Sequence, residues 1–223
     1  MRARWATFDC YGTLVDWNSA FEDALRPLFG TSTSNAIRAY HRFERQLEEE
    51  RPHRLYKDVL STGLSRVAES MDFRLPKGKA ERLQRAWATM PVFADVELML
   101  AELRAMGFRL AVLTNCDNDL FEETQKTFRY PFDEVVTAEQ VGAYKPSLSH
   151  FQQFAKRTGV RPGEWVHVAC SWYHDIVPAK TMGIPRFWLD RDRSGHDPGV
   201  STARVLSGHE VCPAIRDFLS RPQ

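Results

Sequence analysis

Residues 4–14 read RWATFDCYGTL, and this stretch sets the expected fold, because a short apolar run ends in a carboxylate and is followed by a glycine. Residues 4–9 (RWATFD) fit a buried β-strand, so Asp9 lies at the carboxyl end of that strand. Gly12 permits a tight turn directly after it. A lone Asp in this position is more often a helix cap, so its function depends on what the rest of the chain brings to the same place.

Strand and helix patterns alternate beyond this stretch. Strands are expected at 108–114, 134–137, 165–170 and 185–189, and helices at 95–106, 118–128, 148–158 and 174–182. Units of this length predict parallel strands, right-handed crossovers and helices on both faces of the sheet. The expected fold class is therefore α/β, with a doubly wound, Rossmann-like parallel sheet.

One long segment interrupts the alternation. Residues 16–91 have helical patterning and no convincing strand, and they are too many for an ordinary loop. They predict a helical cap domain inserted at the carboxyl edge of the sheet, where it would close over a site. The core domain would then comprise residues 1–15 and 92–223. The competing interpretation is a helical decoration that only covers apolar surface.

Composition narrows the class of function. The chain has 30 Lys and Arg against 29 Asp and Glu, so its net charge of +1 gives no overall field that would recruit nucleic acid or a membrane. No stretch approaches the roughly 20 apolar residues that span a bilayer, and the N-terminal apolar run is too short for a signal peptide. A cytoplasmic location is expected. The four cysteines form no CxxC pair, which favours free thiols over a structural metal site.

Polar residues recur where the predicted strands end. Asp9 ends the first strand, Thr114 and Asn115 end the second, Lys145 follows the third and Asp175 follows the fourth. Ligands of open α/β sheets bind outside the carboxyl ends of the strands, so these segments should meet in one crevice. Each residue alone is compatible with an ordinary cap, turn or surface position. Their combination in this order indicates an active site.

These same segments resemble a known family. FDCYGTL (8–14), LAVLTN (110–115), YKP (144–146) and SWYHD (171–175) resemble the four ordered motifs of the haloacid dehalogenase superfamily, over essentially the whole chain. With Tyr11 two places after Asp9, the first motif resembles that of the type II (S)-2-haloacid dehalogenases. Phosphatases of the superfamily usually carry a second Asp at that place, where it protonates the leaving group. A departing halide needs no proton, so Tyr11 favours carbon–halogen chemistry.

The resemblance implies a role for each matching residue. Asp9 would displace halide from the substrate carbon and form an aspartyl ester that water hydrolyses. Thr13 would hold the catalytic loop, Lys145 would neutralise the paired carboxylates, and Asp175 would orient or activate the water. The implied substrate-binding residues are Tyr11, Arg42, Thr114, Asn115, Ser171 and Trp172.

The expected partner is a small-molecule substrate, a short 2-haloacid or haloacetate, with no metal and no other cofactor. Lys145 can balance Asp9 and Asp175 for a monoanionic haloacid. The alternatives are a hydrolase of another electrophile, such as a Mg²⁺-dependent phosphatase, and a binding protein without turnover. A second carboxylate beside an intact nucleophile argues against the binding protein. A homodimer is implied by the resemblance alone.

Several positions depart from the family pattern. Where type II dehalogenases typically show Ser-Ser-Asn before the fourth-motif Asp, this chain has Cys170, Ser171 and Trp172, and Phe151 stands where a Tyr is frequent. Losing a positioned donor often costs about a hundredfold in turnover, so these changes could signal a different substrate. Tyr173 or His174 could supply the missing polar group, although His174 also fits an ordinary helix start.

The cap should supply a halide-binding Arg and apolar walls. Both Arg42 and Arg45 lie near the expected position, and Arg42 is preferred. Either could instead pair with a nearby Glu at helical spacing. Trp17, Phe43 and Trp172 could exclude water from the first chemical step, although such aromatics are more often plain core.

Overall fold

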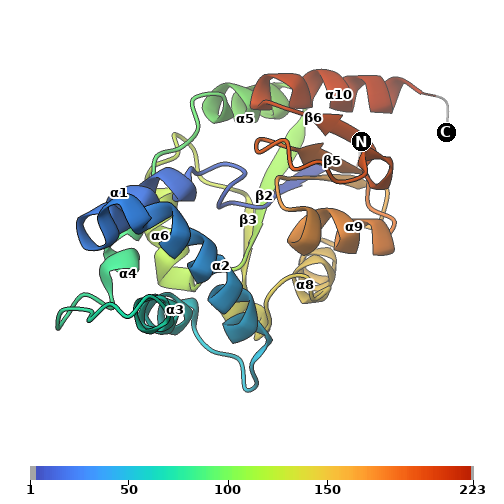
Figure 1. Cartoon of the computed structure of the whole chain (residues 1–223). Coiled ribbons are helices and arrows are strands. Elements are labelled where there is room, and N and C mark those ends of the chain that lie inside the picture. Colours follow the sequence, from blue (N-terminus) through green and yellow to red (C-terminus); the bar gives the residue numbers. More distant parts are fainter. Residues whose placement is uncertain (1–3, 222–223) are drawn as a thin grey trace.

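Six parallel strands form one sheet in the order β3-β2-β1-β4-β5-β6 (Figure 1). The computed structural model describes residues 4–221. The central strand β1 pairs with β2 on one side and β4 on the other, and Phe8 lies opposite both Val112 and Val168. The strands are β1 (Arg4–Phe8), β2 (Phe108–Thr114), β3 (Glu134–Thr137), β4 (Trp165–Ala169), β5 (Arg186–Leu189) and β6 (Ala203–Val205).

Helices cover both faces of the sheet. Helices α5 (Val96–Ala105) and α10 (Gly208–Ser220) pack together on one face, and α8 (Ser149–Thr158) and α9 (Val177–Thr181) lie on the other (Figure 1). Helices α6 (Asn118–Gln125) and α7 (Ala138–Val141) follow β2 and β3. The expected doubly wound α/β fold is therefore confirmed.

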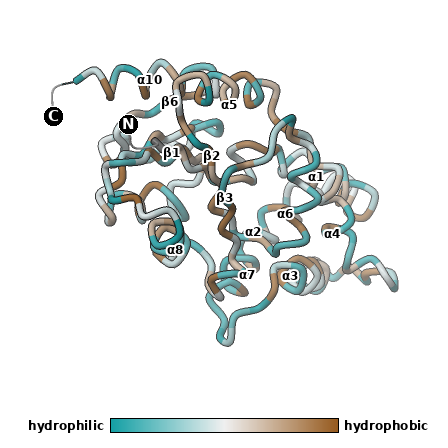
Figure 2. Tube along the Cα trace, turned by 180° about the vertical axis from the view of Figure 1, so that it is seen from behind, coloured by the Kyte–Doolittle hydropathy of each residue, from teal (hydrophilic) through white to brown (hydrophobic). Residues whose placement is uncertain are grey.

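The two-residue period of the strands accounts for a sheet that is buried on both sides. In β1, Trp5 packs with Phe154 of α8, whereas Ala6 and Phe8 belong to the larger core on the opposite face. Figure 2 shows β3 in strongly hydrophobic colours in the interior, while the outer helices alternate between polar and apolar residues. Burial on both faces is why these strands are nearly continuous apolar runs.

The segment between β1 and α5 is helical. It contains α1 (Trp17–Phe29), the 3₁₀ turn Gly30–Ser32, α2 (Thr33–Glu49), α3 (Tyr56–Ser70) and α4 (Arg82–Trp87). All of these helices fall within residues 16–91. They pack on one another beside the carboxyl edge of the sheet (Figure 1). This is the expected inserted helical cap, although its division from the core at residues 15 and 92 stays a prediction.

A core residue fixes one cap helix. Asp117, which follows β2, is fully buried and accepts hydrogen bonds from the backbone N–H groups of Tyr56 (2.7 Å) and Lys57 (2.9 Å). These N–H groups belong to the first turn of α3, where backbone donors have no acceptor within the helix itself. A carboxylate from the core therefore caps a helix of the cap.

The C-terminal third differs most from the sequence-based expectation. The expected helix at 174–182 is a π-helical turn, Trp172–Ile176, followed by the short α9. Strand β6 was not expected, because it has three residues at the sheet edge and its pattern is too short to detect. Helix α10 was not expected either. Between residues 4 and 221, no helix is long and apolar enough to cross a membrane.

Candidate active site

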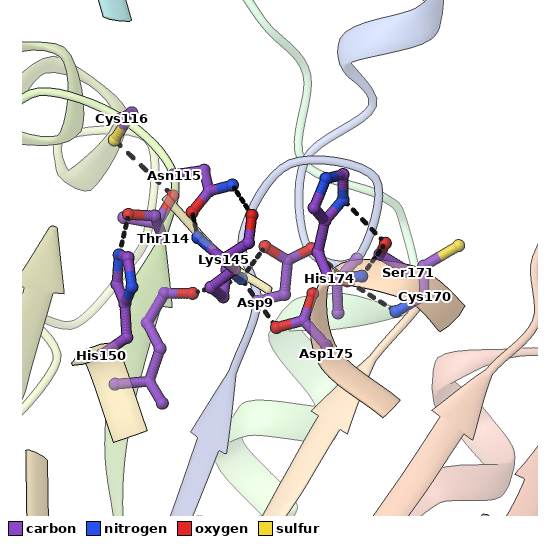
Figure 3. A network of polar contacts seen from close by, with 12 residues as sticks. Asp9, Thr114, Asn115, Cys116, Lys145, His150, Cys170, Ser171, His174 and Asp175 are labelled. Carbon is purple, nitrogen blue, oxygen red and sulfur yellow. Dashed lines mark hydrogen bonds and ion pairs between the residues drawn. The ribbon is translucent and has the colours of Figure 1, made fainter. Parts of the chain in front are cut away.

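The four polar segments meet at the carboxyl edge of the sheet, as expected. Asp9 follows β1, Asn115 follows β2, and Asp175 lies in the π-helical turn after β4. Lys145 comes from the loop after α7 (Figure 3). Their side chains come from distant parts of the chain and are brought together because parallel strands end at the same edge.

Lys145 lies between the two carboxylates. Its Nζ donates to Asp9 Oδ1 at 2.9 Å, to Asp175 Oδ1 at 2.7 Å and to the carbonyl oxygen of Leu113 at 2.8 Å (Figure 3). All three ammonium protons therefore have an acceptor. Only 1% of Lys145 is exposed, so this charge is held in a fixed position away from bulk water.

The charges in this cluster affect one another. Burial raises the pKa of Asp9, and the repulsion from Asp175 adds to it, while Lys145 partly opposes the rise. Burial also acts against the charged form of Asp175, but Lys145 and a hydrogen bond from His167 outweigh it and lower the pKa of Asp175 to about 2. Burial opposes the charge on Lys145, but the two carboxylates outweigh it and raise the pKa of Lys145. Asp175 and Lys145 are therefore held as ions.

Thr13 orients Asp9 from the turn that follows β1. Its hydroxyl donates to Asp9 Oδ2 at 2.8 Å and accepts from the backbone N–H of Cys170 at 2.9 Å. Gly12 has φ +91°, and a Cβ there would lie 3.0 Å from the indole nitrogen of Trp17. This turn therefore requires glycine. Thr13 from the turn and Lys145 together hold both oxygens of Asp9.

A cavity of about 580 Å³ opens above this cluster, between core and cap. Asp9, Lys145 and Asp175 line it, which makes it the expected crevice. The other predicted residues on its wall are Tyr11, Asn115, Ser171 and Trp172, and the cap contributes Trp17, His41, Glu44, Arg45, Glu48, Tyr56 and Trp87.

Some predicted residues have a different position. Thr114 is fully buried, with its hydroxyl 3.6 Å from Cys116 Sγ, and it does not line the cavity. Arg42 does not line the cavity either, and its guanidinium lies 5.7 Å from the ring centre of Phe43. Arg45 does line it, because residues 41, 44, 45 and 48 share the inward face of α2. We therefore replace Arg42 by Arg45 as the candidate cap arginine.

Tyr11 lines the cavity, but its hydroxyl is engaged by neighbouring side chains. The hydroxyl oxygen accepts from the indole N–H of Trp87 at 2.7 Å and lies 2.8 Å from the Thr124 hydroxyl. Since Thr124 also donates to a helix carbonyl, the Tyr11 proton goes to Thr124. Burial raises the pKa of Tyr11 well above its ordinary value. Tyr11 thus links cap and core and has no proton free for a leaving group.

One histidine near the site, His167, did not stand out in the sequence. His167 of β4 is fully buried, with Nε2 3.1 Å from Asp175 Oδ1 and Nδ1 2.8 Å from the Thr7 hydroxyl. The ring of Phe151 lies 5.0 Å from its ring. Position 151 therefore lacks the Tyr hydroxyl that is frequent in the family, and the neighbouring His167 supplies a donor to Asp175. A lone polar residue in an apolar strand gives no sequence signal for this role.

His174 lies on the cavity wall beside a carboxylate of the cap. Its Nδ1 is 3.0 Å from the Ser171 hydroxyl, and its Nε2 is 3.6 Å from Oε2 of Glu48. Burial opposes a charge on His174, but Glu48 outweighs it and raises the pKa of the imidazole. His174 is therefore part of the site and is more than a helix-start residue.

The residues present do not fit a Mg²⁺ ion well. One oxygen of each site carboxylate, Asp9 Oδ1 and Asp175 Oδ1, already accepts a hydrogen bond from Lys145. Cys170 and Ser171 add no carboxylate. Within residues 4–221, no three or more His, Cys, Asp or Glu side chains gather into a group able to hold a metal. Asp175 Oδ2, which has no hydrogen-bond partner in this part of the chain, is the remaining free oxygen.

The fold and site define the class of protein as a hydrolase with an α/β core and a helical cap. The family model "haloacid dehalogenase-like hydrolase" matches residues 3–183, which is most of the chain. The chain therefore belongs to the haloacid dehalogenase-like hydrolases, as the motifs predicted.

Relatives within this family have two kinds of activity. The chain is 25% identical over 202 residues to an (S)-2-haloacid dehalogenase of Pseudomonas fluorescens, covering 86% of each. It is 30% identical to a glyceraldehyde 3-phosphate phosphatase of Methanopyrus kandleri, covering 95% of this chain and 96% of the relative. The solved L-2-haloacid dehalogenase of Xanthobacter autotrophicus superposes with a TM-score of 0.81 at 17% identity, over 96% of this chain and 98% of that one, which shows the shared fold.

Proposed function

We propose that this enzyme hydrolyses short 2-haloacids or haloacetates through an ester on Asp9, releasing halide and a 2-hydroxy acid, without a metal. The observation that carries the proposal is the state of Tyr11. It stands where a general acid would be needed for an alkoxide leaving group, and its proton is engaged by Thr124. A halide leaves without a proton, so it is the leaving group that suits this site.

In the first step, a carboxylate oxygen of Asp9 attacks the halogen-bearing carbon. The carbon–halogen bond breaks and its electron pair leaves with the halide. Lys145 and Thr13 hold the attacking carboxylate at 2.9 and 2.8 Å, so its orientation is set before the substrate enters. Asn115 and Ser171 lie on the wall where they can donate to the substrate carboxylate.

In the second step, water attacks the carbonyl carbon of the Asp9 ester. Asp175 orients this water through Oδ2, because Oδ1 is already bonded to Lys145 and His167. The ester bond to Asp9 breaks, the 2-hydroxy acid leaves, and one proton is released to solvent. Asp9 is thereby restored as a carboxylate.

The relationship to phosphatases supports a second candidate, hydrolysis of a phosphate ester. A relative named as a glyceraldehyde 3-phosphate phosphatase is 30% identical over nearly the whole chain. This candidate is weaker for two reasons. Tyr11 stands where a phosphatase would carry its general acid, and its proton is engaged by Thr124. Asp9 Oδ1 and Asp175 Oδ1 also already accept hydrogen bonds from Lys145. A cytoplasmic location and a homodimer stay predictions.

One comparison tests both candidates. Chloroacetate, 2-chloropropionate and an aryl phosphate are incubated with the enzyme, with and without EDTA, and halide and phosphate release are measured. We expect halide release that is insensitive to EDTA and absent in Asp9→Asn. Phosphate release that EDTA abolishes, without halide release, would replace the dehalogenase by the phosphatase.

A further inference from the structure

Glu48 of the cap reaches into the corner of the cavity that holds the side chains of Asn115 and His174. Only 8% of the residue is exposed. Its Oε1 accepts from the Asn115 side-chain amide at 3.3 Å, and its Oε2 lies 3.6 Å from His174 Nε2. That nitrogen has no hydrogen-bond partner within residues 4–221. Glu48 therefore occupies the place where Asn115 and His174 point.

The same corner is where an anionic substrate group would have to bind. Lys145 is already engaged by Asp9 and Asp175. Arg191 forms a two-contact ion pair with Asp95, at 2.8 and 2.9 Å. Neither cation is free to receive a further carboxylate. The third cation on the wall, Arg45 of the cap, is the candidate for binding the departing halide. The donors around Glu48 are therefore the best remaining place for a carboxylate.

The charge of the cavity wall further disfavours a substrate carboxylate beside Glu48. The wall carries seven carboxylates but three Lys or Arg side chains; the carboxylates are Asp9, Asp16, Glu44, Glu48, Asp175, Asp190 and Asp192. Adding a substrate carboxylate directly beside an ionised Glu48 would place two like charges in a poorly solvated corner, where they repel strongly. Either Glu48 moves away or the Glu48–His174 pair binds a proton.

The contacts of Glu48 and His174 favour protonation of the pair over movement of Glu48. Burial raises the pKa of Glu48 and the nearby charge of Glu44 adds to the rise, while His174 and Asn115 oppose it only in part, so Glu48 is easier to protonate than an ordinary Glu. His174 can hold the proton instead, since its Nε2 faces Glu48. The other titratable and charged groups that act on this pair are Tyr40 of α2, Tyr56 of α3, and Tyr144, Lys145 and Asp175 of the core. His41 of α2 faces Glu44.

We propose that Glu48 holds the place of the substrate carboxylate in the free enzyme, and that a carboxylate substrate binds with uptake of one proton from solvent by the Glu48–His174 pair. The proton is released again when the product leaves. This inference rests on the proposed function only for the identity of the substrate. It makes Glu48 a specificity-determining residue that weakens carboxylate binding as the pH rises.

The test measures the binding of propionate, a carboxylate without a leaving group, to the full chain by isothermal titration calorimetry. Titrations at pH 6 and 8, each in two buffers of different ionisation enthalpy, give the Kd and the number of protons taken up. For the wild type we expect a Kd at pH 8 at least about tenfold higher than at pH 6, with proton uptake at pH 8.

Glu48→Gln should bind propionate at pH 8 at least about tenfold more tightly than the wild type, while the two proteins bind alike at pH 6. The matched control is Glu49→Gln, an exposed neighbour on the same helix, which should behave as the wild type. Circular dichroism checks that both variants are folded.

The inference is overturned if Glu48→Gln binds no more tightly than the wild type at pH 8, or if wild-type binding takes up no proton. It is also overturned if neither protein binds propionate at pH 6, because the corner is then no carboxylate site. None of these readouts requires turnover. A wild type that binds propionate as expected but releases no halide would contradict the proposed function alone.

Discussion

Replacing Lys145 by Met removes the charge that holds the two site carboxylates together. Its Nζ is 2.9 Å from Asp9 and 2.7 Å from Asp175. At an effective dielectric constant of about 20, each contact corresponds to about 6 kcal/mol of attraction before desolvation is subtracted. Breaking a buried charge pair by removing one partner typically costs about 3–5 kcal/mol. We expect Lys145→Met to lower the free energy of unfolding by about this amount at pH 8.

The loss should depend on pH in a defined direction. Without Lys145, burial and mutual repulsion raise the pKa of at least one of the two carboxyls above its value in the unfolded chain. A group of this kind destabilises the fold as the pH rises through its folded pKa, because the unfolded chain then releases the proton more readily. The variant should therefore be closer in stability to the wild type at pH 5 than at pH 8.

Urea unfolding at pH 5 and pH 8 measures both effects. Lys156→Met serves as the control, because Lys156 is exposed on α8 and should change stability by less than about 0.5 kcal/mol. A Lys145→Met variant that loses less than about 1 kcal/mol at pH 8, or loses the same at both pH values, would refute the proposed charge balance.

Substitutions at three further positions test contacts that only the structure shows. His167→Leu removes a donor to Asp175 at 3.1 Å, so ester hydrolysis should slow by about tenfold or more while halide release in the first turnover stays fast. His167→Gln should restore part of the rate in the same stopped-flow assay, and equal rates for both variants would exclude a positioning role. Tyr11→Phe leaves the buried indole N–H of Trp87 without its acceptor and should cost about 1–3 kcal/mol in urea unfolding. A neutral effect would mean that this link between cap and core does not stabilise the fold. Asp117→Ala removes the acceptor for two N–H groups at the start of α3 and should cost about 0.5–2 kcal/mol. Faster amide exchange confined to the start of α3 is the expected signature, and unchanged exchange there would contradict it.

The sequence was sufficient to predict the central cluster. Asp9, Lys145 and Asp175 follow predicted strands, and parallel strands necessarily end at one edge of the sheet. Their meeting therefore needed only the strand pattern and the order of the motifs. The helical insert was visible for a similar reason, because a segment without strand pattern between the first strand and its crossover helix is here far too long for a loop.

The cap side of the site was harder to predict. Arg42, Arg45 and Glu48 lie on one amphipathic helix, and helical spacing alone does not say which face meets the core. Only the packed structure shows that Arg45 and Glu48 line the cavity and that Arg42 does not. His167 escaped notice because the contact of a strand residue with Asp175 depends on the π-helical turn after β4, which has no recognisable pattern.

The proposed ester on Asp9 is tested most directly by a single turnover of 2-chloropropionate in H₂¹⁸O with enzyme in excess, followed by mass spectrometry of the Asp9 peptide and of the product. If water attacks the carbonyl carbon of the ester, the first ¹⁸O enters the carboxylate of Asp9 and the hydroxy acid carries the original oxygen of Asp9. We expect one ¹⁸O in the Asp9 peptide and none in the product. Label in the product with none in that peptide would show that water displaces the halide directly, and would contradict the nucleophilic role of Asp9.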